Sequence, residues 1–431
     1  MQKKSSRPNK RDRAPRRVWS GAEPLFPPLM PFAARALEIL PRALAKVWPL
    51  NKAHRASLPD DIAELSSLLT QDRSQLRHSY WSKPNFVSAY LYYFLPWNIL
   101  RQCRLLQDLP LPPLHTDGQN WLLDAGSGSL SLPIALWLAR QDLREKKLKI
   151  LALDKSRRPM ELGRGIFESL AALAGLQAWP VSLVKGSFEK AANSLPDGKI
   201  WLFSAANVLN EIVSGRRQGK RFKSQEFMAE DNENDLQLEP YFDAIPAFME
   251  KGAAFLSIEP GTRLGGECMM HLREFAVANG YCAHSPCAHQ EKCPLLARNR
   301  QQATNNHSSL GSAWCHFTFD TSGAPVWLLE LSRKAGLDKK SLSLSPLLLS
   351  ATVPVDKGQP GKCRIISRPF PVPNLSEYCR YGCEKNGLAI LPDAKWLEDG
   401  ALVPFSRPAK PERDKKSGAV IVEPPVVADV K

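Results

Sequence analysis

The sequence lacks long apolar runs and has comparatively little acidic charge. No stretch of 18 uncharged apolar residues occurs among the 431 positions, so no transmembrane helix is expected. Pro27 and Pro28 interrupt the apolar segment near the N-terminus, which therefore does not resemble a signal peptide. Lys and Arg outnumber Asp and Glu by 58 to 43, giving a formal charge of +15. We therefore expect a polyanionic partner, either nucleic acid or an acidic membrane surface.

A secreted disulfide framework is also absent. The chain has nine cysteines, an odd number, and 43% of its residues are hydrophobic, enough for a substantial core without covalent staples. Several of the cysteines are clustered near one another in the sequence. In a chain of this kind such clustering favours a metal site over disulfides.

The basic excess is concentrated at the N-terminus. Residues 1–17 hold eight Lys and Arg against one acid, Asp12, and so contribute +7 of the +15. We expect residues 1–30 to be a basic disordered arm, acting as a solubilising tail or as a phosphate-contacting segment. The lysines, the acid and the prolines disfavour the amphipathic helix of a transit segment. We therefore expect a cytoplasmic location, with the mitochondrial matrix as the alternative.

The pattern of apolar residues changes after residue 117. Residues 31–117 predict helices, and the aromatic run from Tyr80 to Trp97 favours a core. Nearby arginines leave an RNA-facing surface open as an alternative; these are Arg77, Arg101 and Arg104. Later, strands are predicted at 121–124, 149–154, 181–184, 200–203 and 254–258, and helices at 132–143 and 160–173. This alternation predicts an α/β fold with a parallel-rich sheet and helices on both faces.

A glycine turn follows the first predicted strand. Asp124 precedes Gly126 and Gly128 in this turn, and Asp154 ends the next strand, where a carboxylate can accept the hydroxyls of a ribose. Asn207 follows a later strand. Because the carboxyl ends of parallel strands meet at one edge of a sheet, we expect these five residues to form a nucleotide-binding site.

Missing residues narrow the choice of nucleotide. Ser131 stands where a dinucleotide fingerprint has glycine, so S-adenosyl-L-methionine, which has no pyrophosphate, suits the loop better. Leu130 stands at the usual third glycine of a methyltransferase loop, and no Asn-Pro-Pro-aromatic element or catalytic base is recognisable. The catalytic residues are therefore unknown. A methyltransferase-type sheet with an empty pocket remains the alternative.

Four cysteines are spaced as candidates for one metal centre. Cys287 and Cys293 lie near each other, Cys315 follows after a polar insertion, and Cys383 lies in the C-terminal region. Four thiolates suit either zinc or an iron–sulfur cluster, and spacing does not separate the two. Cys379 and Cys363 compete with Cys383 as the fourth ligand. The remaining three are expected to be buried thiols; these are Cys103, Cys268 and Cys282.

At these motifs the sequence resembles the methyltransferase-like proteins of small-ribosomal-subunit assembly, found in bacteria and mitochondria. The matching elements are the Asp124 loop, Val208-Leu-Asn-Glu211, Glu259-Pro-Gly-Thr262, the Cys287 and Cys293 pair, Trp314-Cys-His-Phe317, and Cys383 with Gly387. The resemblance implies an S-adenosylmethionine-dependent methyltransferase-like fold and a [4Fe-4S] cluster held by Cys287, Cys293, Cys315 and Cys383. It also implies association with small-subunit rRNA and the immature small subunit.

The combined pattern predicts six regions. These are a basic arm (1–30), an N-terminal helical region (31–117), a methyltransferase-like domain (118–285), a Cys-rich metal-binding segment with the last sheet strands (286–345), a small C-terminal β region (346–406) and a flexible tail (407–431). We expect a monomer off the ribosome with no membrane contact. The leading hypothesis is an rRNA methyltransferase carrying the cluster. The alternatives are an inactive rRNA-binding scaffold with a structural metal, and zinc in place of the cluster.

Overall fold

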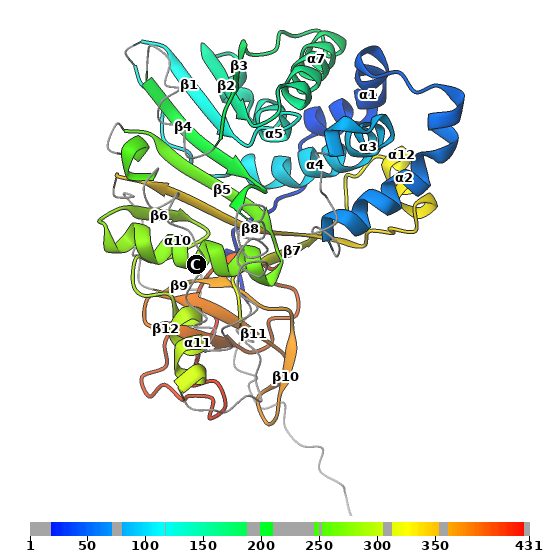
Figure 1. The fold of residues 1–431 in the computed structure, drawn as a ribbon. Coiled ribbons are helices and arrows are strands. Elements are labelled where there is room, and N and C mark those ends of the chain that lie inside the picture. The colour runs from blue at the N-terminus through cyan, green and yellow to red at the C-terminus, as the bar shows by residue number, and fades with distance from the viewer. Residues whose placement is uncertain are drawn as a thin grey trace, which may run out of the picture.

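The computed structural model describes most of the chain. The basic segment 1–17 lies outside the described residues, as does the polar stretch 216–239. Two β-sheets organise the rest: a large sheet surrounded by helices, and a smaller C-terminal sheet beneath it (Figure 1). The described residues are 19–70, 80–116, 118–187, 199–209, 245–249, 252–304, 313–352 and 361–425.

The N-terminal region is helical, as the sequence predicts. It contains α1 (Pro31–Val47), α2 (Lys52–Thr70), η2 (Tyr80–Ser82), α3 (Pro84–Ala89), the π-helical turn η3 (Tyr90–Phe94) and α4 (Leu95–Leu106). The larger aromatic side chains of this region are mostly core residues, with Trp81, Phe86, Tyr93 and Trp97 buried. Of the three arginines considered for an RNA-facing surface, Arg104 is buried, Arg101 is partly buried and donates to Asn207, and Arg77 lies outside the described residues.

The large sheet has the strand order β3-β2-β1-β4-β5-β8-β6, with β7 paired to β8. The first five strands are mutually parallel, whereas β8 runs antiparallel to β5, β6 and β7. The predicted α/β fold with a parallel-rich sheet is therefore confirmed. The strands are β1 (Asn120–Ala125), β2 (Leu148–Asp154), β3 (Val181–Lys185), β4 (Lys199–Ala206), β5 (Ala254–Pro260), β6 (Cys282–Ser285), β7 (Phe317–Asp320) and β8 (Ser341–Ser350).

Helices cover both faces of the large sheet. Successive side chains of a strand point to opposite faces, and here the side chains on both faces are largely apolar. Leu122 belongs to the cluster that includes α1, α4, α5 (Ser131–Ala139), α7 (Arg157–Leu173) and α12 (Val326–Lys334). Its neighbour Leu123 belongs to the opposite cluster, which includes α10 (Arg263–Ala278). Figure 1 shows α10 on the other side of the sheet from α4 and α5.

The helix predicted at 132–143 is interrupted. Arg140 adopts φ −115° and ψ 89°, outside helical geometry, and it separates α5 from α6 (Gln141–Arg144). The polar insertion before Cys315 begins with a helix, α11 (Pro294–Thr304). None of the described helices is long and apolar enough to cross a membrane.

The smaller sheet has the order β13-β9-β11-β12-β14, with β10 paired to β11. Its strands are β9 (Lys362–Ile365), β10 (Phe370–Val372), β11 (Ser376–Glu384), β12 (Gly387–Leu391), β13 (Leu402–Pro404) and β14 (Val420–Ile421).

Two of the expected boundaries differ from this arrangement. The boundary at 346 falls inside β8, whose leucines fill the centre of the large sheet. The tail expected from 407 contains β14, which pairs with β12 and buries Val420 and Val422, so residues 407–425 belong to the smaller sheet.

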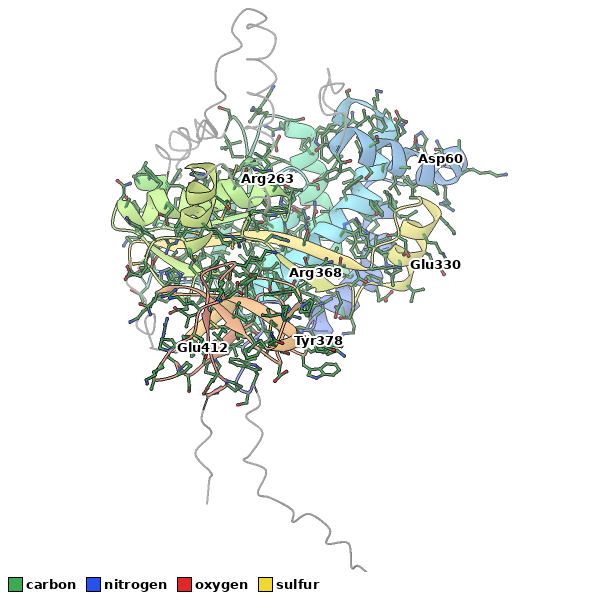
Figure 2. The ribbon with its side chains drawn as sticks, turned by 90° about the horizontal axis from the view of Figure 1, so that it is seen from below. Asp60, Arg263, Glu330, Arg368, Tyr378 and Glu412 are labelled. Atoms are coloured by element: carbon green, nitrogen blue, oxygen red, sulfur yellow. The ribbon has the colours of Figure 1, made fainter. Side chains whose placement is uncertain are left out.

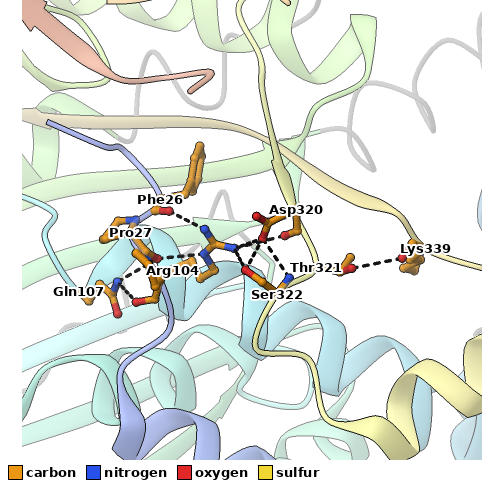
Figure 3. A network of polar contacts seen from close by, with 9 residues as sticks. Phe26, Pro27, Arg104, Gln107, Asp320, Thr321, Ser322 and Lys339 are labelled. Carbon is orange, nitrogen blue, oxygen red and sulfur yellow. Dashed lines mark hydrogen bonds and ion pairs between the residues drawn. The ribbon is translucent and has the colours of Figure 1, made fainter. Parts of the chain in front are cut away.

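Residues 19–30, which the sequence assigns to a disordered arm, pack on the rest of the described chain. Leu25 and Phe26 are buried, and the backbone of Glu23 forms an isolated antiparallel β-bridge with Leu402 of β13. Arg104 of α4 holds this segment in place, because its guanidinium donates to the carbonyls of Phe26 (2.7 Å) and Pro27 (2.9 Å). The same guanidinium pairs with the Asp320 carboxylate at 2.7 Å (Figure 3). These contacts join the segment around Phe26 and Pro27 to α4, and the bridge at Glu23 joins it to β13.

Candidate nucleotide site and cysteine cluster

Asp124 lies at the end of β1 and is almost fully buried, with 2% of its surface exposed. Its two carboxylate oxygens accept hydrogen bonds from the hydroxyls of Ser127 and Ser204, each at 2.6 Å. Burial raises the pKa of Asp124 to about 6, against the lowering effect of the two hydroxyls, and the nearby Asp154 raises it further. The site therefore favours a neutral carboxyl group or a cationic neighbour at this position.

Asp154 ends β2 and faces the same turn. Its carboxylate accepts the backbone N–H groups of Gly128 (3.0 Å) and Ser156 (2.8 Å). Burial raises its pKa, which these two backbone hydrogen bonds oppose. The structure thus brings the two predicted acids to one loop, and a carboxylate with two backbone donors still has lone pairs available for ligand hydroxyls.

The two predicted glycines have different roles. Both have positive φ, +66° at Gly126 and +49° at Gly128, which favours glycine. A Cβ atom at Gly126 would lie 2.3 Å from Cγ2 of Val208, so this glycine also accommodates the chain after β4. At Gly128 the nearest atom would be 4.0 Å away, leaving room beside the loop.

Leu130 occupies the backbone conformation of the missing third glycine. It is left-handed, with φ 61° and ψ 34°, yet its side chain is fully buried. A left-handed non-glycine residue costs about 1–2 kcal/mol, and burying a leucine offsets that cost. The loop therefore keeps the geometry of a glycine turn while using the position for packing.

Asn207 follows β4 and also has a positive φ, 62°. Its side-chain oxygen accepts a hydrogen bond from Arg101 of α4 at 2.8 Å. Burial lowers the pKa of Arg101 to about 10, although the neighbouring Tyr90 and Glu259 favour its charge. Sequence reasoning missed Arg101 as part of this site, because nothing in the linear pattern joins α4 to the end of β4. Asn210 and Glu211, which complete the matching motif, lie outside the described residues.

The four candidate metal ligands lie at the junction of the two sheets. Cys287 follows β6, Cys293 precedes α11, Cys315 precedes β7 and Cys383 lies in β11. Burial raises the pKa of Cys293 to about 11 and the pKa values of Cys315 and Cys383 well above their ordinary value. Charge on the other cysteines of the group raises the Cys383 pKa further, so the four thiols are close enough to influence one another.

Two arginines, which the sequence did not single out, accompany these thiols: Arg273 is buried and Arg364 is partly buried. Arg273 of α10 donates to the carbonyl of His289 at 3.1 Å, and Arg364 of β9 donates to the carbonyl of Pro286 at 2.7 Å. The His289 ring nitrogen lies 3.2 Å from the Cys383 sulfur. A four-thiolate centre carries net negative charge, so two guanidinium groups at this place would stabilise it.

The competing cysteines lie elsewhere. Cys363 and Cys379 are fully buried in two other apolar clusters of the smaller sheet, and the three remaining cysteines are buried as predicted. Among the described residues, however, no group of three or more His, Cys, Asp or Glu side chains is arranged to hold a metal ion. The expected metal-binding segment is thus present as a group of thiols, and a single-ion site is not found in it.

Known structures that are similar to the chain carry methyltransferase titles. One is precorrin-6y C5,15-methyltransferase from Geobacter metallireducens, with 14% identity, 57% of this chain and 81% of that chain covered, and a TM-score of 0.27. Another is the human methyltransferase 10 domain containing protein, with 9% identity, 59% and 83% covered, and a TM-score of 0.28. TrmN from Thermus thermophilus has 14% identity, 45% and 47% covered, and a TM-score of 0.25.

A search of curated proteins finds no match to the chain. Residues 239–333 match the model of a family described as mitochondrial small ribosomal subunit Rsm22. The matched segment contains Glu259, Cys287, Cys293 and Cys315, whereas Asp124 and Cys383 lie outside it. The match confirms the resemblance that the motifs indicate: this chain is similar to the Rsm22 family of the small ribosomal subunit.

Proposed function

We propose that the chain is an assembly protein of the small ribosomal subunit that binds S-adenosyl-L-methionine and rRNA. The observation that carries the proposal is the match of residues 239–333 to the Rsm22 family. The two acids at the ends of β1 and β2, which share one glycine turn, support the cofactor part. The net charge of +15 supports an RNA partner.

The residues at this edge of the sheet fit such a cofactor. Asp154 would accept the ribose hydroxyls, Asp124 would face the cationic amino-acid end, and Gly128 leaves open space for close approach. Asn207 and the turn at Gly126 would form the remaining walls. The cofactor, when bound, supplies an electrophilic methyl group on a sulfonium. The chain would contribute mainly by positioning, since no catalytic base is assigned.

Calorimetry tests the cofactor site. We expect heat on titrating the intact protein with S-adenosyl-L-methionine or S-adenosylhomocysteine, and affinity lowered about tenfold or more by Asp154→Ala, which removes the hydroxyl acceptor. The exposed Asp60→Ala in α2 is the matched control and should bind like the wild type. Absence of heat with either ligand would reject the cofactor part.

A second candidate function is an rRNA-binding scaffold without catalysis. The observations that favour it are the close packing of Val208 on Gly126, the two hydroxyls that already occupy the Asp124 carboxylate, and Leu130 in the loop. Transfer of a tritiated methyl group to rRNA in immature small subunits distinguishes the two candidates. Incorporation that Asp124→Ala abolishes would favour the enzyme, and its absence in the wild type would favour the scaffold.

We also propose that Cys287, Cys293, Cys315 and Cys383 hold a [4Fe-4S] cluster. Zinc–sulfur bonds of about 2.3 Å would place four tetrahedral sulfurs about 3.8 Å apart, and no group of donors in the described chain is arranged for a single ion. A cuboidal cluster holds its ligand sulfurs further apart, and charge on neighbouring thiols of the group raises the pKa values of Cys293, Cys315 and Cys383. The buried Arg273 and the partly buried Arg364 would offset its charge. Such a cluster would cross-link the two sheets.

Anaerobic purification tests this centre. We expect a brown protein with visible absorption, lost on Cys383→Ser but retained in Cys379→Ser, since Cys379 lies on the same strand β11 but in another apolar cluster. A colourless protein containing one zinc ion would contradict the cluster. Equal loss in both variants would contradict the choice of the fourth ligand.

The partner and the compartment follow from the same family. The family description names the mitochondrial small ribosomal subunit, so we propose rRNA of that subunit as the partner and the mitochondrial matrix as the compartment, against the cytoplasm expected from the N-terminal composition. Co-sedimentation of the purified chain with small-subunit particles at low salt tests the partner. Failure to co-sediment would count against it. Imaging of the tagged chain in cells tests the compartment.

A further inference from the structure

A cavity of about 370 Å³ lies between α11 and the smaller sheet. Its wall includes the segment before β7, where Trp314 and His316 stack on each other with ring centroids 5.1 Å apart. Tyr381 of β11 also lines it, and Phe370 stacks on that ring at 4.5 Å. We call this cavity the aromatic pocket. Its volume falls in the range of small-molecule sites. Two wall residues, Trp314 and Tyr381, each stack on a neighbouring ring, so two stacked aromatic pairs contribute to the wall.

The charge of the aromatic pocket is positive. Arg298 of α11 and Arg368, which follows β9, both line it, and neither guanidinium has a hydrogen-bond or ion-pair partner among the described residues. The acid in its wall, Asp399, is paired with the buried Arg380 at 2.5 Å and so does not neutralise them. Figure 2 shows Arg368 on the face formed by the smaller sheet.

The wall of the aromatic pocket adjoins the candidate metal-binding cysteines, because several wall residues share an apolar cluster with Cys293 and Cys315. Trp314 and His316 flank Cys315 in the chain, and Leu388, another wall residue, is the strand partner of Cys383. Its shape is therefore fixed by the same junction that holds the two sheets together. A rigid wall of this kind lowers the entropic cost of ordering a ligand.

We propose that the aromatic pocket binds one unstacked base of single-stranded RNA, with Arg298 and Arg368 contacting its phosphates. Aromatic rings accept the flat face of any base, and guanidinium groups bind phosphate oxygens in paired hydrogen bonds. The proposal rests on the proposed function in one respect, the choice of RNA as the ligand class. It assigns this contact to a place remote from the glycine turn of β1.

Fluorescence anisotropy with a labelled unstructured RNA of about eight nucleotides tests the proposal on the full, anaerobically purified chain. Tyr381→Leu removes the stacking ring and should weaken binding about tenfold, whereas Tyr381→Phe keeps the ring and should bind like the wild type. Arg368→Gln should weaken binding by a similar factor. It should also lower the slope of log affinity against log salt concentration by about one, because one phosphate contact is lost.

Arg333→Gln is the matched control for charge. Arg333 is exposed at the end of α12, and its replacement changes the net charge by the same amount. The proposal would be overturned if Arg368→Gln and Arg333→Gln lowered RNA affinity equally and Tyr381→Leu bound RNA as tightly as the wild type. If Tyr381→Leu unfolds, the double variant Arg298→Gln with Arg368→Gln replaces it, because both side chains are only partly buried or exposed.

The same variants separate this proposal from the proposed function. Wild-type chain that co-sediments with small subunits, but whose RNA affinity is insensitive to pocket variants, would overturn the pocket and leave the assembly role standing. Specific loss of oligonucleotide binding in Tyr381→Leu and Arg368→Gln would support the pocket even if the chain does not join the particles.

Discussion

Replacing Asp124 by Asn should stabilise the protein near neutral pH. The carboxyl group is buried, and its pKa rises from 3.8 to about 6 in the folded chain. Its partners are the hydroxyls of Ser127 and Ser204, which can accept as well as donate hydrogen bonds. An asparagine amide can therefore take the place of the carboxyl group without leaving a donor unsatisfied.

The magnitude follows from the linkage between proton binding and folding. Between the unfolded and folded pKa values the folded chain binds more protons at this site, so stability from this group is present below about pH 4 and is lost as the pH rises through about 6. A shift of about two units corresponds to about 3 kcal/mol. Asp124→Asn should remove this loss, so it should be more stable than the wild type by about 3 kcal/mol at pH 8 and about equal to it at pH 4.

Urea unfolding of both proteins across this pH range measures the effect. Asp154→Asn is the matched comparison with the opposite expectation, because both oxygens of Asp154 accept backbone N–H groups and an amide nitrogen would face one of them. We expect that variant to be less stable than the wild type at neutral pH, where Asp154 is ionised. Asp124→Asn no more stable than the wild type at about pH 8, or a difference that grows as the pH falls, would refute the reasoning.

Three further substitutions test the packing, each by the free energy of unfolding in urea. Arg104→Ala should destabilise by about 3 kcal/mol because it leaves buried carbonyls without donors; a loss below about 1 kcal/mol would contradict the role given to Arg104. Gly126→Ala should destabilise by about 3 kcal/mol through positive φ and collision with Val208, whereas Gly175→Ala, with a positive φ but open space, should cost only about 1 kcal/mol. Equal losses would remove the packing argument. Leu130→Gly should also destabilise, by about 3 kcal/mol, because the cavity outweighs the relieved strain; a more stable variant would show that strain dominates.

The elements of the large sheet that the sequence predicted best are those whose apolar runs end at charged or turn residues. Strands β1 and β2 end at or within one residue of Asp124 and Asp154, and their carboxyl ends meet because the strands are parallel. The two acids of the nucleotide site could therefore be placed from the linear pattern. The glycine turn between β1 and α5 follows for the same reason.

Long-range pairings could not be derived from local pattern. β8 reads as part of the C-terminal region, yet it lies between β5 and β6 in the large sheet. The segment 19–30 reads as the end of a disordered arm, yet Arg104 binds its carbonyls. In both cases the hydrogen-bonding partner lies far away in the chain. Which backbone groups are buried, and therefore need a hydrogen-bond partner, is decided only when the core is packed.

By itself the sequence determined the fold class, the acid pair at the ends of two strands and the identity of the cysteines at the junction, because these depend on residue type and short spacing. The tertiary structure decided which surroundings those groups have. It buried Asp124 against two hydroxyls, brought the Arg101 guanidinium to Asn207, brought Arg273 and Arg364 to the cysteines and formed the aromatic pocket between α11 and the smaller sheet. Burial and charge at a site depend on packing between distant segments, and no local pattern encodes that packing.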